Sequence, residues 1–394
     1  MAALFCSAVP FWLYRNISSI GLACLMSTVS IPELSIIIPL LNEEQTLPQL
    51  FHSLEAQTGL CCQVIFCDGG SVDNSLSLLE NYAHSSCHQV VVLSGEQGRG
   101  WQMNQGADVA NSERLLFLHA DSFWHQTTLL QDALNCFAEL ESESRSAAIA
   151  AHFSLQFSGS DCHNRFYRYL SEKSQLNRPG TIYGDQGMLL SKKLWHEIGG
   201  FSDESVILED VLFVEQVAQL GQWVLLPQVI FTSNRRYQRE GRLQRVIRNG
   251  LMLIVAGAGF GHLLSSSAAL SGGYHAGERG STLSSFAALA SLLHRMSLTR
   301  YGCFWYGCGR EIAHHFWLVI YAASWAIPLI DCDQRRAILS FYDRRVAPLM
   351  IYPIIYTVFA VLSWFLFYLF YLCLPLSWLV QRKGKQRQFP KEHV

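Results

Sequence analysis

Short apolar runs alternate with segments of helical spacing through the first third of the chain. Four runs have the length and the apolar character of strands, and the apolar core of the fourth is typical of a strand buried on both faces of a sheet. They are LSIIIPLL at 34–41, QVIFCD at 63–68, QVVVLS at 89–94 and RLLFLHAD at 114–121. After the first run, apolar side chains recur at helical spacing, at Leu47, Leu50, Phe51 and Leu54. This alternation predicts a mostly parallel sheet with helices on both faces, a Rossmann-type α/β fold.

The pattern is less regular in the second third of the chain. The run AAIAAHFSLQF at 147–157 predicts another strand, and 183–201 predicts a loop, a short strand and a helix. The segment ILEDVLFVEQVAQLG at 207–221 predicts a helix closed by its last glycine. The arginine-rich segment at 232–242 predicts a basic loop that runs into a further helix. We expect all these elements to form one domain, from 31 to 250.

The last third of the chain contains long apolar segments. Residues 346–380 contain no charged side chain, and this run exceeds the roughly 20 residues that a membrane-spanning helix needs. We therefore expect 346–380 to be a transmembrane helix region, preceded by a helical extension at 251–345. The apolar segment at 316–330 is shorter, so a second span competes with a re-entrant or interfacial helix. The basic tail at 381–394 predicts a C-terminus that faces the cytoplasm.

Composition adds limits to this picture. Half of the 394 residues are apolar and only 15% are charged, whereas about 25% is usual in soluble proteins. The formal net charge of −2 gives no indication of a nucleic acid partner. The 12 cysteines follow no framework spacing, which indicates reduced thiols in a cytosolic domain. Residues 1–30 lack the charged start and long apolar core of a signal peptide, so we interpret them as a poorly specified leader.

An acid follows the fourth predicted strand, at Asp121. Ligands of open α/β sheets bind beyond the carboxyl ends of the strands, and a carboxylate there suits Mg²⁺ or Mn²⁺ held together with substrate phosphates. A turn residue that caps the next helix is the alternative. His119 is a candidate second ligand or a structural histidine at the strand end.

The second and third predicted strands also end in candidate ligand-binding residues. Asp68 precedes paired glycines that allow a close approach of the backbone to a ligand. Its carboxylate could accept hydrogen bonds from a nucleobase or a ribose, or it could form an Asx-turn. The GRG sequence around Arg99 opens a helix and resembles an anion-binding helix start with Arg99 available for a phosphate, and one such short motif is a weak signal by itself.

Two adjacent acids, Glu209 and Asp210, open a later predicted helix. An acid in a first turn is favourable with the helix dipole, and a carboxylate here could instead act as a general base toward an attacking hydroxyl. Asp185, in a predicted loop, could position that hydroxyl. Arg235 and Arg236 could neutralise a phosphate or a lipid headgroup, or form a solvated basic face.

Six segments, in this order, resemble the family-2 glycosyltransferases of the GT-A fold. They are LSIIIPLLNEE, CDGGSVDNS, GRGWQMNQGA, LLFLHADS, YGDQGMLLSKKLWHEIGGF and ILEDV. The resemblance spans about 34–250 and is closest to the subgroup of rSAM/selenodomain-associated transferases. It implies a GT-A-like sheet, a nucleoside-diphosphate sugar as donor and a divalent cation, Mg²⁺ or Mn²⁺.

The resemblance also implies roles for single residues. Around the nucleotide it places Pro39, Asn42, Glu43, Asp68, Arg99, Gln102 and Asn104. Asp121 would be the metal-binding acid, with His119 standing where many relatives have another aspartate. Asp210 would be the catalytic base, beside Glu209. Asp185 and Gln186 would lie on the acceptor side, and Arg235 and Arg236 are further candidates there.

These features together predict an inverting glycosyltransferase that transfers one sugar to a hydroxyl acceptor. Processive polymerases carry a tryptophan-containing motif that RRYQREGR does not match. Membrane attachment suits a lipid-linked acceptor, and cytosolic nucleotide sugars require a catalytic domain that faces the cytoplasm. A nucleotidyltransferase is one alternative, although the acidic NEEQ after the first strand disfavours triphosphate binding. A non-catalytic, membrane-bound nucleotide-sugar-binding protein is the other.

Overall fold

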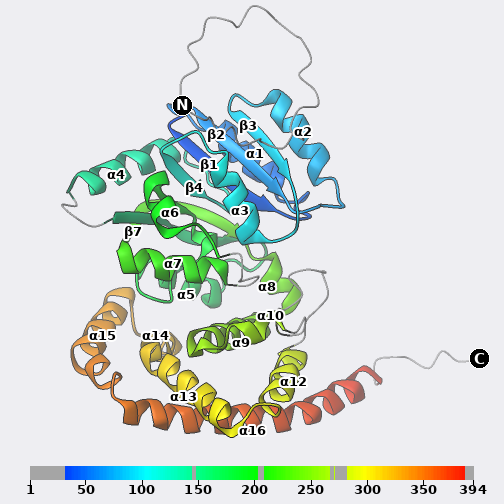
Figure 1. Ribbon diagram of the computed structural model, residues 1–394, viewed down its shortest axis with the longest axis vertical. Helices are drawn as coiled ribbons and strands as arrows, with labels where there is room; N and C mark the ends of the chain where they lie inside the picture. Colours follow the sequence, from blue (N-terminus) through cyan, green and yellow to red (C-terminus); the bar gives the residue numbers. More distant parts are fainter. Residues whose placement is uncertain (1–31, 144–147, 203–207, 267–269, 271–281, 387–394) are drawn as a thin grey trace, which may run out of the picture.

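A seven-stranded sheet forms the upper part of the molecule (Figure 1). The computed structural model describes residues 32–143, 148–202, 208–266, 270 and 282–386. The strand order is β3-β2-β1-β4-β6-β5-β7, and only β6 runs antiparallel to its neighbours. The strands are β1 (Leu34–Leu40), β2 (Cys62–Asp68), β3 (Gln89–Ser94), β4 (Arg114–Phe117), β5 (Ala148–Ser158), β6 (Met188–Ser191) and β7 (Gly221–Ser233). The predicted mixed α/β fold with a mostly parallel sheet is confirmed.

Helices cover both faces of this sheet, as the continuous apolar strands predict. Every residue of β1 is buried. Ile36 and Ile38 pack toward one face, whose helices are α1 (Leu47–Glu55), α2 (Ser75–Ser85) and α4 (Leu129–Glu143). Ile37 packs toward the other face, whose helices are α3 (Arg99–Asp108), α6 (Lys192–Ile198) and α7 (Glu209–Leu220). Alternate side chains of one strand therefore enter two separate hydrophobic cores.

The edge of the sheet differs from the prediction. Residues 221–233 form β7, which pairs in parallel with β5, and the predicted basic loop is the short helix α8 (Arg235–Glu240). The sequence pattern gave no strand there because β7 alternates only partly and contains Pro227. Proline is tolerated at the edge of a sheet, where one side of the strand needs no hydrogen-bonded neighbour.

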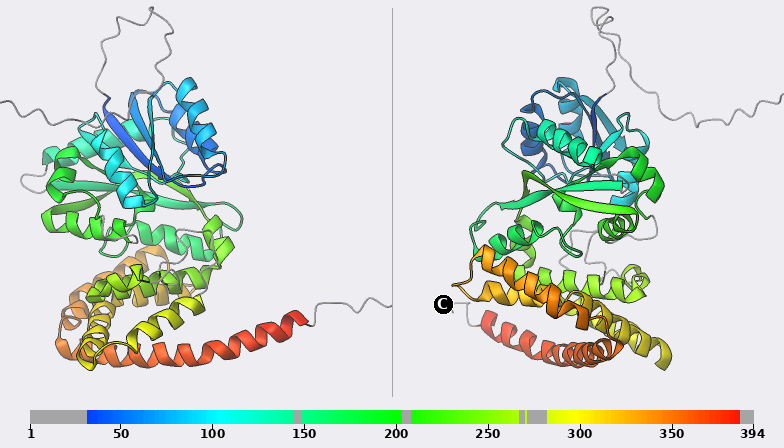
Figure 2. Two further views of the ribbon diagram at one scale, coloured as in Figure 1. Left: turned by 45° about the vertical axis from the view of Figure 1, so that its right-hand side comes forward. Right: turned by 90° about the vertical axis from the view of Figure 1, so that its left-hand side faces the viewer.

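A layer of helices lies below the sheet (Figures 1 and 2). Its members are α9 (Arg242–Val255), α10 (His262–Ser265), α12 (Thr282–Leu293), α13 (Leu298–His314), α14 (Phe316–Ala326), α15 (Cys332–Arg345) and α16 (Pro353–Gln386), with a π-helical turn at Ala256–Phe260 and a 3₁₀ turn at Ala347–Leu349. In both figures α16 runs across the base of the molecule, roughly perpendicular to its long axis. Among the described helices, only Pro353–Leu372 is long and apolar enough to cross a membrane.

The helical layer is tied to the sheet domain through α5 (Arg165–Ser174). The hydroxyl of Tyr321, in α14, donates a hydrogen bond to the Glu172 carboxylate at 2.7 Å. Arg335, in α15, forms two hydrogen bonds with the same carboxylate. The segment at 316–330, for which a membrane segment was one expectation, thus packs with its aromatic side chains against α5.

Gly106 offers a test of the contact between α3 and the sheet. A Cβ atom there would lie 2.5 Å from Ile37 Cγ2 and 2.8 Å from Cys67 Sγ. We expect Gly106→Ala to lower the free energy of unfolding by roughly 1–3 kcal/mol, because β1 and β2 would have to move. Gly302→Ala is the control, since a Cβ at that helical position meets nothing within 4 Å. Urea unfolding should give a lower midpoint only for Gly106→Ala.

Candidate active site

The loops after β1 and β2 are bonded to each other at the carboxyl edge of the sheet. The backbone N–H of Asn42 donates to Ser71 Oγ at 2.8 Å, and that of Val72 donates to Asn42 Oδ1 at 2.8 Å. The N–H of Glu43 donates to Ser75 Oγ at 2.9 Å. Asn42 has a positive φ of 55°, a conformation that asparagine tolerates better than most residues. Two of the expected nucleotide residues therefore lie in a preformed loop pair.

Three other expected nucleotide residues hold backbone in place. Asp68 accepts hydrogen bonds from the N–H groups of Gly70 and Ser71, which is the Asx-turn alternative. The Gln102 amide donates to the carbonyls of Leu40 and Cys67. Asn104 exchanges two hydrogen bonds with the Phe201 backbone. Asp68 and Gln102 are buried, so both support the loop geometry whatever they bind.

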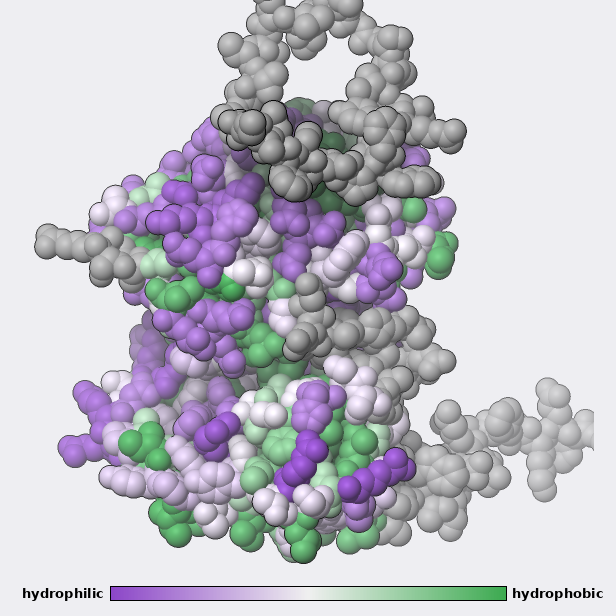
Figure 3. All heavy atoms as spheres, in the orientation of Figure 1, coloured by the Kyte–Doolittle hydropathy of each residue, from purple (hydrophilic) through white to green (hydrophobic). Residues whose placement is uncertain are grey.

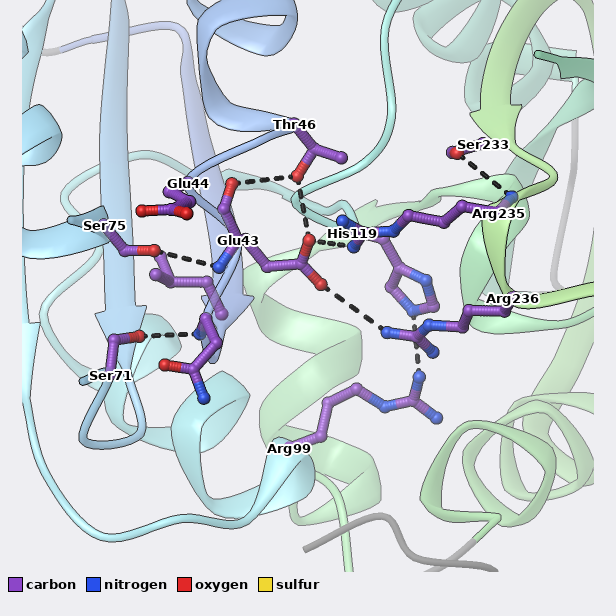
Figure 4. Close-up of polar contacts among 12 residues, drawn as sticks. Glu43, Glu44, Thr46, Ser71, Ser75, Arg99, His119, Ser233, Arg235 and Arg236 are labelled. Carbon is purple, nitrogen blue, oxygen red and sulfur yellow. Dashed lines mark hydrogen bonds and ion pairs between the residues drawn. The ribbon is translucent and has the colours of Figure 1, made fainter. Parts of the chain in front are cut away.

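A chain of charged side chains crosses the carboxyl edge (Figure 4). Glu43 forms ion pairs with Arg235 and Arg236, which come from the end of the domain far along the sequence. Figure 4 also shows the Arg99 guanidinium pointing toward the His119 ring, and its Nη1 donates to His119 Nε2 at 3.2 Å. The fold thus brings expected nucleotide-side and acceptor-side residues into one cluster.

Arg99 also pairs with the two acids that begin α7. Its Nε contacts the Glu209 carboxylate, and its Nη2 lies 3.7 Å from Asp210 Oδ1. Glu209 is only 1% exposed. Burial raises the pKa of Glu209, and the charge and hydrogen bond of Arg99 oppose that rise. One guanidinium thus compensates both acids of the Glu-Asp pair.

The start of α7 meets two loops at Gly184. The Gly184 N–H donates to Asp210 Oδ2 at 2.9 Å, which fixes the orientation of that carboxylate. A Cβ at Gly184 would lie 3.0 Å from His119 Nε2 and 3.2 Å from Asp210 Oδ2. The loop after β4, the loop before β6 and the first turn of α7 therefore converge within a few ångströms.

Asp185 lies among the other acids of the site. Burial and the negative charges of Asp210 and Asp121 together raise its pKa to about 6, while Lys173 and Arg99 oppose this rise. Its Oδ1 is buried and has no hydrogen-bond partner among the residues that the structure describes. Asp121, Asp185 and Asp210 therefore share one electrostatic environment with excess negative charge.

The carboxylates of Asp121, Asp185 and Asp210 suit a divalent cation better than the His119 ring does. Burial, Arg99 and Arg236 hold the pKa of His119 well below its usual value, so the ring is neutral. However, its Nε2 already accepts the hydrogen bond from Arg99. Within the described ranges, no group of three metal-ligating side chains closes around Asp121. The carboxylates are hard oxygen ligands suited to Mg²⁺ or Mn²⁺, with substrate phosphates completing the shell.

The remaining acceptor-side candidate, Gln186, is buried and donates a hydrogen bond to the Thr181 carbonyl. Two residues that the sequence analysis missed lie beside Asp185 instead. The Lys173 ammonium lies 5.0 Å from the centroid of the Tyr183 ring. Burial lowers the pKa of Lys173, and the charge of Asp185 opposes this. Tyr183 is the first residue of the quoted segment YGDQGMLLSKKLWHEIGGF, but no local pattern connects Lys173 in α5 with it.

Residues 35–198 match the model of the family described as Glycosyl transferase family 2. This segment contains β1 through β6 and ends at α6. The Glu209–Asp210 pair and the arginines at 235 and 236 lie beyond the matched residues.

Curated relatives match parts of the same region. A PGL/p-HBAD biosynthesis glycosyltransferase of Mycobacterium bovis is 34% identical over 100 residues, which are 25% of this chain and 39% of the relative. The O-antigen chain rhamnosyltransferase WbaN of Salmonella anatum is 22% identical over 205 residues, 48% of this chain and 62% of the relative. The chain thus spans about two fifths of the length of the mycobacterial relative.

Solved structures also align with this chain. The mannosyltransferase PcManGT from Pyrobaculum calidifontis, in complex with GDP-Man and Mn²⁺, gives a TM-score of 0.43 at 18% identity and covers 84% of this chain and 88% of its own. S. aureus TarS 1-349, in complex with UDP, gives a TM-score of 0.43 at 16% identity and covers 79% of this chain and 91% of its own.

The raised pKa of Asp185 predicts a pH dependence of stability. Between pH 3.8 and about 6 the native chain keeps a proton that the unfolded chain releases, so the free energy of unfolding should fall as the pH rises through this window. Asp185→Asn removes this titration. Above pH 6 we expect the free energy of unfolding of the variant to exceed that of the wild type by up to roughly 3 kcal/mol.

Urea unfolding at pH 4.5, 5.5 and 7 measures this difference. Asp108→Asn, which changes an exposed acid of α3, is the matched control and should follow the wild type. A constant difference between Asp185→Asn and the wild type across the three pH values would contradict the assignment.

Proposed function

We propose that this protein transfers a sugar from a nucleoside-diphosphate sugar to a hydroxyl acceptor, with inversion and with one transfer per encounter. The observation that carries the proposal is the position of Asp210 against residues 35–198, the segment that matches glycosyl transferase family 2. Its carboxylate is oriented by the Gly184 N–H and lies in the environment of Asp121 and Asp185. The same residues support the finer proposal of an rSAM/selenodomain-associated transferase.

Asp210 would act as general base toward the acceptor hydroxyl. As the hydroxyl oxygen attacks the anomeric carbon, its proton passes to the carboxylate and the bond to the diphosphate breaks on the opposite face. A positioned base typically contributes about 10²–10⁴-fold. Glu209, paired with Arg99, would keep the first turn of α7 in place. Asp185, with its buried oxygen, would orient the acceptor, and Gln186 would hold that loop.

The donor would lie across the loops of β1, β2 and β4. Pro39, Asn42 and Asp68 would surround the nucleoside, and Gln102 and Asn104 would support these loops from α3. The Glu43 carboxylate forms ion pairs with the guanidinium groups of Arg235 and Arg236. A diphosphate would compete with Glu43 for them and add charge-assisted hydrogen bonds.

A divalent cation, Mg²⁺ or Mn²⁺, would be held by Asp121 and by the donor diphosphate. When bound, it supplies charge neutralisation for the leaving group. His119 could become a ligand only if Arg99 released its Nε2. The excess negative charge around Asp185 supports a cation at this position.

We further propose that the protein works at a membrane with its catalytic domain on the cytoplasmic side. The length and apolar character of the helix at 353–372 support the membrane location. The cytosolic supply of nucleotide sugars supports the cytoplasmic orientation of the catalytic domain. A lipid-linked acceptor follows from the same arrangement.

Asp210→Asn tests the base. We expect the turnover number to fall about 10²–10⁴-fold because the amide cannot take the proton. Nucleotide binding should be retained because the amide oxygen can still accept the Gly184 N–H. Release of nucleoside diphosphate from UDP-, GDP- or CDP-sugars in the presence of a membrane lipid extract measures turnover, and calorimetry measures binding. Turnover equal to that of Asp108→Asn would exclude this role.

Asp121→Ala tests the cation site. We expect the Mn²⁺-dependent part of nucleotide-sugar binding to be lost, because the carboxylate that anchors the cation is gone. Thermal-shift titrations with and without Mn²⁺ separate this part from cation-independent binding. An unchanged Mn²⁺ effect in the variant would show that the cation binds elsewhere.

A further inference from the structure

The helix α16 is apolar on both of its long faces. Its inner face packs on the helical layer, where Ala360 and Phe367 are buried. Its outer face carries an uninterrupted stripe of exposed apolar side chains at spacings of three and four residues: Ile354, Val358, Val361, Phe365, Leu369 and Leu372. A helix that is apolar all round belongs in a core or in a membrane environment. We therefore expect the outer face of α16 to contact an apolar environment.

The neighbouring helix α13 indicates how α16 meets that medium. The two helices run antiparallel, because Trp364 Nε1 donates to the Tyr301 hydroxyl at one end and His314 Nε2 lies 3.0 Å from the Tyr356 hydroxyl at the other. At the second end α13 also carries Arg310 and Glu311. If α16 crossed a bilayer, these charges would enter it too, at a cost of about 2.5–3.5 kcal/mol for an arginine or lysine near the centre.

A helix that lies flat avoids this cost. In Figures 1 and 2 α16 stays at the base of the molecule in every view, with the rest of the helical layer above it. Figure 3 shows hydrophobic side chains along this lower edge. Lying flat, α16 would insert its outer stripe into the bilayer surface and keep Arg310 and Glu311 above it.

The chemistry of this edge favours a bilayer over a second protein copy. Trp364 and Tyr301 are hydrogen-bonded to each other at the base, and tyrosine and tryptophan are enriched at membrane–water interfaces. Arg295 and Arg300, at the turn before α13 and at its start, are exposed. Exposed arginines beside an apolar stripe attract anionic headgroups.

A cavity of about 650 Å³ lies above α16, between α9, α12 and α13. Its wall is apolar apart from the side chains of Ser363 and Cys308. Its volume is in the range of ligand sites, typically about 300–1,000 Å³. Leu366 and Leu369 line the cavity and are also 58% and 47% exposed. The cavity is therefore continuous with the outer surface of α16.

We propose that this cavity binds the hydrocarbon chain of a membrane lipid, which enters from a bilayer on which α16 lies flat. The wall offers a chain apolar contact along its length and no charged partner for a headgroup. A headgroup would remain near the interface, close to Arg295 and Arg300.

A packing contact links the wall of this cavity to the candidate active site. Leu208 immediately precedes Glu209 and Asp210, and its side chain packs on the hydrophobic cluster that forms the cavity wall. Two sources of the chain are compatible with this geometry, a bilayer phospholipid and the lipid part of an acceptor. The binding proposal holds for both and does not depend on the proposed sugar transfer.

Gly250 provides a variant that fills the cavity. It lines the wall, and a Cβ added there meets nothing within 4 Å, so Gly250→Phe places a ring in open space. Gly302→Phe is the matched control, because Gly302 is exposed on α13, has equally open space and is outside the wall.

The full chain is mixed with phosphatidylcholine–phosphatidylglycerol vesicles that contain a phospholipid with a diazirine in its acyl chain, without nucleotide sugar. After irradiation, mass spectrometry maps the adducts. We expect adducts on Leu251, Phe304 and Phe367 in the wild type. Gly250→Phe should lower them roughly fivefold or more, because a filled cavity has no room for the chain. Gly302→Phe should leave them unchanged.

Vesicle flotation and circular dichroism check that both variants fold and bind membranes alike. Adducts confined to the outer stripe, or equal adducts in the wall for both variants, would overturn the cavity assignment. Failure of the wild type to float would overturn the proposal as a whole. If phospholipid adducts form in the wall and then fall when membrane lipid extract is added, the extract contains the preferred chain.

The orientation of α16 has its own measurement. A nitroxide-bearing non-natural residue is placed in turn at Ile354, Val361 and Leu369, and its depth in the vesicle is measured by power-saturation spectroscopy. A flat helix gives the same depth at all three. In a crossing helix the depths measured at Ile354 and Leu369 would differ by about 22 Å, and such a difference would overturn the flat orientation.

Discussion

The guanidinium of Arg99 holds the candidate active site together. It lies against the buried Glu209, 3.7 Å from Asp210 and 3.2 Å from His119. Buried carboxylates are costly unless they are paired, so the first turn of α7 can stay inside the domain only while Arg99 is present. The helix α3, which carries Arg99, packs closely on β1 and β2 through Gly106. The position of the charge therefore depends on a close contact in which the helix contributes a glycine and the strands contribute the Ile37 and Cys67 side chains.

The site shows a conflict between stability and chemistry. Asp185 keeps a buried carboxyl oxygen without a hydrogen-bond partner among the described residues, and its pKa is raised to about 6. Glu209 likewise keeps one buried oxygen without a partner in the described part of the chain. Such groups lower stability, and they are the groups that a cation, a donor and an acceptor hydroxyl would satisfy. Glu43, by contrast, forms ion pairs with both Arg235 and Arg236.

The helical layer connects this chemistry to an apolar base. On one side α14 and α15 are bonded to α5 through Glu172. On the other side Leu208 packs on the cluster around the cavity. The candidate base Asp210 thus follows directly after a residue in contact with the layer. A membrane at the base would hold the sheet domain at a fixed height above the lipid surface.

The sequence by itself determined the local elements and the chemistry at the strand ends. Strands β1 and β2, and the apolar core of β4, are continuous apolar runs that indicate burial on both faces, and the apolar run of β3 forms a half-buried edge strand. Asn42, Asp68, Asp121 and Asp210 could be singled out because each lies at or shortly after the end of a strand, or in the first turn of a helix. The 35 residues without charge at 346–380 indicated a long apolar helix, although α16 begins at Pro353 and ends at Gln386.

Only the tertiary structure decided which of these residues meet. Arg99 and Glu209 are 110 positions apart, and Glu43 and Arg235 are 192 apart. No local periodicity encodes such pairs, because they depend on how helices pack on the sheet. The same holds for Gln102, whose amide satisfies strand carbonyls, and for Lys173 beside Asp185. The edge strand β7 escaped prediction for a related reason, since its conformation comes from pairing with β5 and not from its own apolar pattern.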